Sequence, residues 1–97
     1  MERQVVLRQL RNHIGQIRQR FSVRALAIFG SVARDDAADG SDVDVMVVFE
    51  GKAGFDLFME LKFYLEDLLG TQVDLVTDKA LRPQVRQAIE QEMIHVA

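Results

Sequence analysis

The first twenty residues place apolar side chains with the period of a helix. One apolar stripe recurs at spacings of one, three and four residues, which is the pattern of an amphipathic helix with one buried face. We therefore predict a helix over about residues 2–20. The stripe consists of Val6, Leu7, Leu10, Ile14, Ile17 and Phe21.

Two short apolar segments follow and lack this period. Residues 23–29 are mostly apolar and stop at Gly30, and residues 42–49 are rich in β-branched side chains and stop at a glycine-containing loop. Segments of this length and composition predict buried strands. Between them we expect one helical turn over residues 31–35, followed by a turn-rich connection over residues 36–41.

The second half of the chain repeats the alternation of helix and strand. Residues 55–69 have helical length and end at Gly70, residues 72–77 form a third strand, residues 82–93 a last helix and residues 95–96 a short final strand. This order predicts an α/β (α+β) fold with a small mixed sheet flanked by helices.

The helix expected over 55–69 carries a second apolar line besides its main buried face. Phe55, Met59 and Phe63 recur at intervals of four residues, which is wider than one core contact requires. Two interpretations remain open. The helix is either buried on two sides within the domain or presents this line to a partner.

The composition is that of one compact globular domain. The chain has 97 residues, of which 48% are hydrophobic and 28% charged, with one proline and no cysteine. These values exclude collagen-like, disordered and disulfide-stapled classes, and the lack of cysteine excludes thiolate zinc sites. We therefore expect a single domain over residues 1–97.

No segment indicates insertion into a membrane. The first residues lack the apolar stretch of a signal peptide, and no segment approaches the roughly 20 apolar residues of a membrane span. We expect a cytoplasmic protein without a membrane partner.

Charge is distributed unevenly along the chain. Seven arginines and no acid lie between Arg3 and Arg34, whereas fourteen acids and five bases follow from Asp35 onward. Because no aromatic residues interleave with the arginines of the first helix, a solvated helix edge is favoured there over a nucleic-acid surface. These helix arginines are Arg8, Arg11 and Arg18.

Two acids lie at the start of an otherwise apolar strand. Asp42 and Asp44 are two residues apart, so both carboxylates project from one face of the sheet. Like charges this close repel, and a shifted pKa or a bound cation relieves the repulsion. Oxygen ligands on a rigid strand suit magnesium.

A phosphate-binding turn is expected at the same end of the sheet. If strands 23–29 and 42–49 pair antiparallel, Gly30 and Ser31 face the two carboxylates, and a glycine lets the backbone approach a phosphate closely. Asp74 is a third acid, embedded in the strand over 72–77 and costly to bury alone. Three carboxylates facing such a turn are typical of two-metal phosphoryl transfer.

Residues 29–34 and 41–45 together resemble a known signature. Phe-Gly-Ser-Val-Ala-Arg followed by Ser-Asp-Val-Asp-Val is similar to the Gly-Ser-x10-Asp-x-Asp motif of the DNA polymerase beta-like nucleotidyltransferase superfamily. Length and the segment 73–76 resemble its minimal nucleotidyltransferases, the MNT family, and the similarity spans nearly the whole chain. One departure is Asp35, where members often carry glycine.

The resemblance implies the nucleotidyltransferase fold and an activity. Proteins of this kind act as antitoxins paired with a helical, RNA-cleaving HEPN toxin, and transfer AMP from ATP to a tyrosine of that toxin. By resemblance, Asp42 and Asp44 bind two magnesium ions. Asp74 would hold the catalytic ion and help to deprotonate the attacking hydroxyl.

The resemblance also assigns the nucleotide-binding residues. Gly30 and Ser31 would hold the β- and γ-phosphates of ATP, and Arg34 would neutralise triphosphate charge. His13 and His95 lie outside the motif and are expected at the surface or the edge of the core. Ser31 is not favoured as a covalent nucleophile, because no histidine or lysine base lies near it in sequence.

Other functions remain open at this point. The chain could neutralise its partner by binding alone, could act on a small-molecule acceptor such as an aminoglycoside, or could bind operator DNA through the helix arginines. Its oligomeric state, homomeric or heteromeric, is equally open.

Overall fold

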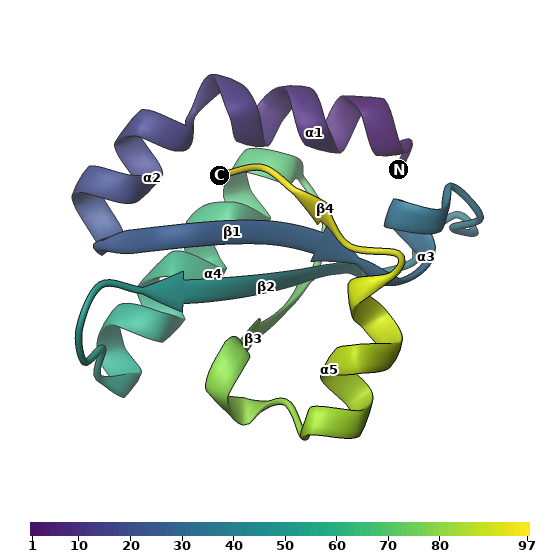
Figure 1. Ribbon diagram of the computed structural model, residues 1–97. Coiled ribbons are helices and arrows are strands. Elements are labelled where there is room, and N and C mark those ends of the chain that lie inside the picture. Colours follow the sequence, from purple (N-terminus) through teal and green to yellow (C-terminus); the bar gives the residue numbers. More distant parts are fainter.

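The computed structural model describes all 97 residues as a four-stranded sheet with helices on both sides (Figure 1). The helices are α1 Arg3–Asn12, α2 Ile14–Phe21, α3 Gly30–Arg34, α4 Phe55–Leu69, α5 Pro83–Glu90 and the 3-10 helix η1 Asp78–Ala80. The strands are β1 Val23–Phe29, β2 Val43–Phe49, β3 Val73–Thr77 and β4 Ile94–His95. This is the mixed α/β architecture expected from the sequence.

The sheet has the strand order β3-β2-β1-β4. β2 pairs antiparallel with β1 and parallel with β3, whereas β4 pairs antiparallel with β1. The parallel pair is connected by the crossover helix α4, as parallel neighbours require. The antiparallel pairing of 23–29 with 42–49, and the place of the third strand beside 42–49, are both confirmed.

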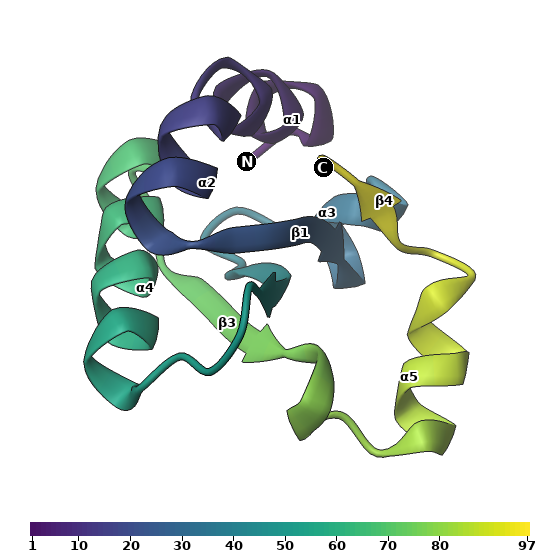
Figure 2. The ribbon, with the colours of Figure 1, turned by 60° about the vertical axis from the view of Figure 1, so that its left-hand side comes forward.

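The two faces of the sheet are covered very differently. Figure 2 shows α1, α2 and α4 gathered on one side and α5 standing on the other. Val43, Val45 and Val47 point to the first side and are fully buried in a core formed with these three helices. The intervening residue Asp44 points to the second side, where α5 buries none of its own residues.

The first helix is broken at His13, so the prediction of one continuous helix over 2–20 was wrong. The His13 amide donates to the carbonyl of Leu10 at 3.2 Å, and the His13 ring nitrogen Nδ1 bonds the carbonyl of Gln9 at 2.8 Å. The ring thus takes the place of the amide in the helical hydrogen-bond ladder. The predicted apolar stripe is nevertheless confirmed as the core-facing side, with Ile14 partly buried and the other five residues buried.

Smaller differences concern the ends of elements. The first helical turn begins at Gly30 instead of residue 31, and the strands expected over 42–49 and 72–77 each begin one residue later. α5 ends at Glu90, not at 93, because the chain must extend again to pair Ile94 with β1. No helix in the fold combines the length and apolar character needed to cross a membrane.

The second apolar line of α4 lies at the surface. Phe55 is 75% exposed and Phe63 is 54% exposed, while Met59 between them is half-buried. Of the two interpretations left open by the sequence, burial on two sides within the domain is therefore wrong.

Candidate active site

The turn that leaves β1 is built around Gly30. This residue has a φ of +72°, a region that disfavours side chains. The carboxyl group of Asp44 lies where a Cβ of residue 30 would stand, so any larger residue would also collide with it. Both the positive φ and the nearby carboxyl group therefore require glycine at position 30. The turn lies directly against the carboxylate of Asp44.

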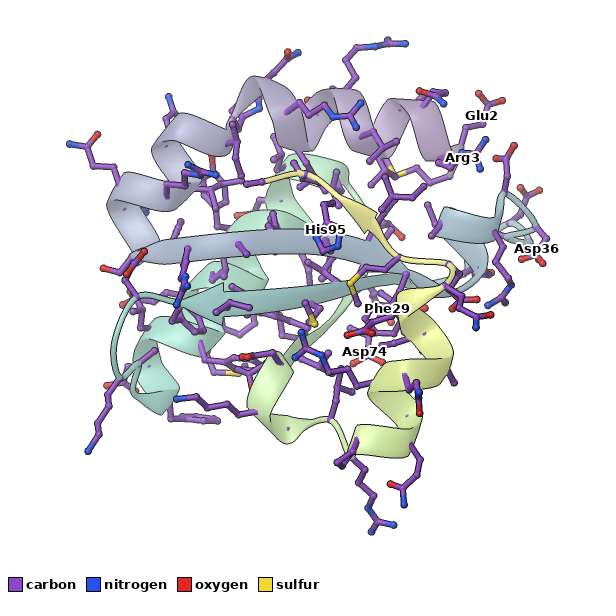
Figure 3. The ribbon with its side chains drawn as sticks, viewed as in Figure 1. Glu2, Arg3, Phe29, Asp36, Asp74 and His95 are labelled. Atoms are coloured by element: carbon purple, nitrogen blue, oxygen red, sulfur yellow. The ribbon has the colours of Figure 1, made fainter.

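The sheet register brings the three predicted acids to one end. Asp44 is the register partner of Phe29 on β1 and of Asp74 on β3. Asp42 immediately precedes β2, whose first amide, that of Val43, donates to the carbonyl of Gln72 at 3.0 Å. Figure 3 shows Phe29 and Asp74 at this same end of the sheet.

The acids differ in exposure. Asp44 is half-buried, whereas Asp42 and Asp74 are exposed. The cost that burial would impose on Asp74 does not arise, because its carboxylate lies at the surface. An open position leaves the Asp74 carboxylate accessible to a second substrate.

The carboxyl group of Asp44 has a shifted pKa. Partial burial raises the pKa of the Asp44 carboxyl above its ordinary value, and the neighbouring Asp74 and Asp42 raise it further. Arg34 opposes this effect. The negative charges are therefore incompletely compensated by the chain itself.

A divalent cation would supply that compensation. As the side chains stand, no three His, Cys, Asp or Glu residues converge into a ready ligand group. The donor set nevertheless consists of carboxylate oxygens on adjacent strands, which suits magnesium, and the raised pKa of Asp44 indicates the repulsion that a cation relieves. The residues fit a hard cation by their chemistry.

Glu92 also belongs to the site, although no motif or spacing in the sequence indicated it. Its Oε1 accepts a hydrogen bond from the amide of Gly30 at 3.0 Å, and its Oε2 accepts one from Arg34 Nη1 at 2.9 Å. The Arg34 contact lowers the pKa of the Glu92 carboxyl, and Glu92 raises that of Arg34. Arg34 also donates to Asp36 through Nε at 3.2 Å.

A second residue that the sequence analysis did not predict, Arg3, contacts the end of α3. Arg3 donates to the carbonyl of Ala33 at 3.2 Å, and its guanidinium lies 3.8 Å from the carboxylate of Asp35. Arg3 therefore has a structural contact to this turn, which the sequence analysis did not predict. Asp35 follows α3 with a left-handed φ of 64°, a backbone conformation that glycine adopts more readily than aspartate.

Glu66 fixes the start of β3 and hence the position of Asp74. Its Oε2 accepts bonds from the amide of Val73 at 3.0 Å and from Lys62 Nζ at 3.1 Å. The Val73 amide, and then Lys62, lower the pKa of the Glu66 carboxyl. Beside these residues an open polar hollow reaches Asp42 and Asp74. It is lined also by Asp67, Thr71 and Gln72.

The two histidines lie apart from this cluster. His13 joins α1 to α2, and His95 is exposed on β4, where Figure 3 labels it.

Comparisons with known proteins agree on one family. The profile of the nucleotidyltransferase domain matches residues 10–96. The protein adenylyltransferase MntA of Thermococcus cleftensis is 40% identical over 84 residues, which are 87% of this chain and 85% of that protein.

Solved structures give the same answer. A minimal nucleotidyltransferase superposes with a TM-score of 0.82 and 35% identity, covering 97% of this chain and 95% of that one. The chain is also similar, in fold alone, to a chain from Shewanella oneidensis. That chain belongs to a complex between a tri-AMPylated HEPN toxin and an MNT antitoxin. It gives a TM-score of 0.67 at 18% identity, over 98% of this chain and 71% of that one. With the profile, these matches show that the chain belongs to the nucleotidyltransferase-domain family and, within it, to the minimal nucleotidyltransferases related to MntA.

Proposed function

We propose that this nucleotidyltransferase moves AMP from ATP, with magnesium, to a tyrosine hydroxyl of a HEPN-type toxin and thereby acts as its antitoxin. One observation carries the proposal. The Gly30 turn lies against Asp44, and Asp74 is the register partner of Asp44, so a glycine turn and two strand carboxylates lie at one end of the sheet. The curated relative MntA supports AMP as the transferred group, and the HEPN complex supports the class of partner.

The triphosphate would lie over α3. Gly30 allows the backbone to approach the β- and γ-phosphates, Ser31 adds an amide and a hydroxyl, and Arg34 supplies positive charge from the end of the same turn. The three residues come from one short segment, so their relative positions are set locally. The α-phosphorus would then face the carboxylates.

Asp42 and Asp44 would hold both magnesium ions, and Asp74 would help to hold the catalytic one. Bound magnesium supplies charge neutralisation to the α-phosphate and the leaving pyrophosphate. The strands contribute rigidity, because Asp44 and Asp74 are held opposite each other by the parallel pairing of β2 and β3. Catalysis by such a site rests on positioning and electrostatics.

Transfer would be an in-line displacement at the α-phosphorus. The acceptor oxygen forms a bond to the α-phosphorus while the bond from that atom to the bridging oxygen breaks, and pyrophosphate leaves with the electron pair. The proton of the hydroxyl passes to the Asp74 carboxylate. Asp74 is exposed and adjoins the open polar hollow, so a hydroxyl carried by another protein can reach it.

The decisive experiment uses ATP labelled at different phosphates. We expect the purified chain to transfer label from the α-phosphate, and none from the γ-phosphate, to a co-purified HEPN toxin in the presence of magnesium. The Asp42→Ala/Asp44→Ala variant should transfer neither. Equal α-label transfer by that variant would refute the assignment, and transfer of γ-label would show a kinase instead. A tyrosine-to-phenylalanine toxin tests the acceptor.

One observation supports a second function, neutralisation of a partner by binding alone. Phe55 and Phe63 are exposed large apolar residues on α4, and Phe55 borders a mostly apolar hollow with Phe58 and Phe49 at the opposite end of β2 from Asp44. Under this alternative the Asp42→Ala/Asp44→Ala variant still protects cells from the toxin. A Phe55→Ser/Phe63→Ser variant would then lose protection.

A further inference from the structure

The carboxylate of Glu92 binds the Gly30 amide and the Arg34 guanidinium, in the segment that the proposed function assigns to phosphate binding. One oxygen accepts from the amide of Gly30 at 3.0 Å and the other from Arg34 at 2.9 Å. A carboxylate with one charge-assisted bond to each oxygen resembles a phosphate held by two of its oxygens. Glu92 comes from a distant part of the chain, 62 residues after Gly30.

We propose that Glu92 is an internal competitor of the nucleotide, which occupies the phosphate subsite in the free protein and is displaced by the triphosphate of ATP. This inference rests on the function proposed above and adds a regulation of the same site. The amide of Gly30 has one proton, so it cannot serve Glu92 and a phosphate oxygen fully at once.

Charge makes the two occupants incompatible as well. Arg34 is paired with both Glu92 and Asp36, so one guanidinium already faces two carboxylates. A triphosphate approaching Arg34 would meet the Glu92 charge beside it, in addition to Asp44. Withdrawal of Glu92 leaves Arg34 paired with Asp36 alone, frees its Nη1 for a phosphate oxygen and removes one negative charge beside it.

The segment that carries Glu92 is lightly anchored, so it can withdraw. Glu92 lies between α5, which has no buried residue, and β4, which has two residues. Figure 2 shows α5 standing off from the sheet. After β4 the chain is tied to β1 at Leu26, whose carbonyl accepts from the amides of Val96 at 2.8 Å and Ala97 at 3.2 Å and whose amide donates to the carbonyl of Ala97 at 3.4 Å. Because β4 joins Glu92 to these bonds, withdrawal of Glu92 would weaken them.

Nucleotide binding by Glu92→Gln tests the proposal directly. Glutamine keeps the size of the side chain and an acceptor for the Gly30 amide but cannot pair with Arg34 as an anion. We expect the variant to bind a non-hydrolysable ATP analogue with magnesium about fivefold more tightly than the wild type by calorimetry, because the competent state is then populated more fully.

The matched control is Glu90→Gln. This substitution also removes one negative charge from the same segment. Glu90, however, accepts a hydrogen bond from Arg86 Nε at 3.0 Å and has no hydrogen bond to the Gly30 turn. We expect its nucleotide affinity to equal that of the wild type. An equal gain in both variants would assign the effect to net charge and overturn the inference.

The remaining outcomes distinguish failure of this inference from failure of the proposed AMP transfer. If the wild type binds the analogue and Glu92→Gln binds it equally or more weakly, Glu92 positions Arg34 and does not compete, and the inference fails alone. If neither protein binds, both fail. In the wild type, the analogue should also speed hydrogen exchange at the Val96 amide, and unchanged or slower exchange contradicts displacement.

Discussion

The two faces of the sheet show how one strand serves stability and chemistry together. On the side of α1, α2 and α4, the strand residues are valines and other apolar side chains, each at most 5% exposed. On the side of α5, the same strands present Asp44 and Asp74 beneath a thin cover. The packed face holds the main cluster of buried apolar residues, whereas the open face buries Met46 and Ala27 outside that cluster.

The division is sharpest between two neighbours in sequence. Val45 is fully buried in the core, while Asp44, one residue earlier, adjoins the Gly30 turn and is repelled by two other acids. Because side chains alternate along a strand, a chain of this size can build a charged site directly behind its core. The rigidity of the packed side then holds the charged side in register.

The largest effect is expected for Asp44→Asn. Transfer of AMP should fall about a thousandfold, equivalent to about 4 kcal/mol, because the carboxylate charge is lost from the centre of the site. The metal-free variant should nonetheless unfold at a higher temperature than the wild type near neutral pH. Activity and melting curves measured on one preparation would show both changes.

The sign of the stability change follows from the raised pKa of Asp44. The folded protein holds this proton more tightly than the unfolded chain, so the native state is penalised as pH rises above the ordinary aspartate value of 3.8. The advantage of the variant should therefore vanish in strong acid. A variant that is less stable than the wild type at neutral pH would break the contrast between the faces.

Val45→Ala is the matched change on the packed face. We expect a loss of about 2 kcal/mol in the free energy of unfolding, since two buried methyl groups are replaced by a small cavity. The turnover number at a temperature where the variant remains folded should be little changed. Urea denaturation gives the first quantity, and a large loss of turnover by folded protein would contradict the separation of roles.

Glu66 connects the two faces, and its removal should have an intermediate effect. Glu66→Ala loses the contacts to the Val73 amide and Lys62, so the melting temperature should fall and the position of Asp74 should loosen. Because these contacts lower the Glu66 pKa, the stabilisation is present above the ordinary value of 4.5 and is lost as pH falls through the lowered pKa. Glu66→Gln, which retains an acceptor for Val73, should recover part of the loss near neutral pH.

The smallest effect is expected for Asp35→Gly. Glycine relieves the left-handed backbone at the end of α3 but loses the pair with Arg3, so the free energy of unfolding should change by less than about 1 kcal/mol. AMP transfer should persist. Asp35→Val, which keeps the backbone strain and adds a β-branched side chain, should be clearly less stable in the same melting assay.

Local patterns predicted most of the elements. β1 and α4 match their predicted ranges because each is bounded by a glycine that ends it, Gly30 and Gly70. The break at His13 was missed because a ring nitrogen that replaces an amide leaves the apolar periodicity intact. The early end of α5 depends on the pairing of β4 with β1, a contact between distant parts of the chain.

In the candidate site, too, local patterns predicted some residues, whereas contacts between distant parts of the chain were missed. Gly30 and Asp44 could be placed together from spacing and antiparallel pairing alone. Glu92 and Arg3 could not, because each reaches the turn across tertiary contacts of 58 and 30 residues respectively. The roles of all six predicted residues in ATP and magnesium binding stay predictions until they are tested by substitution; these residues are Gly30, Ser31, Arg34, Asp42, Asp44 and Asp74.

The intact mass of the HEPN partner after incubation with ATP and magnesium tests the central claim most directly. With the wild-type chain we predict a gain of one or more whole AMP units on the partner, removed by Asp42→Asn/Asp44→Asn and preserved by Asp39→Asn, an acid in the loop between α3 and β2. An unmodified partner with the wild-type chain, or equal modification with the double variant, would contradict the account.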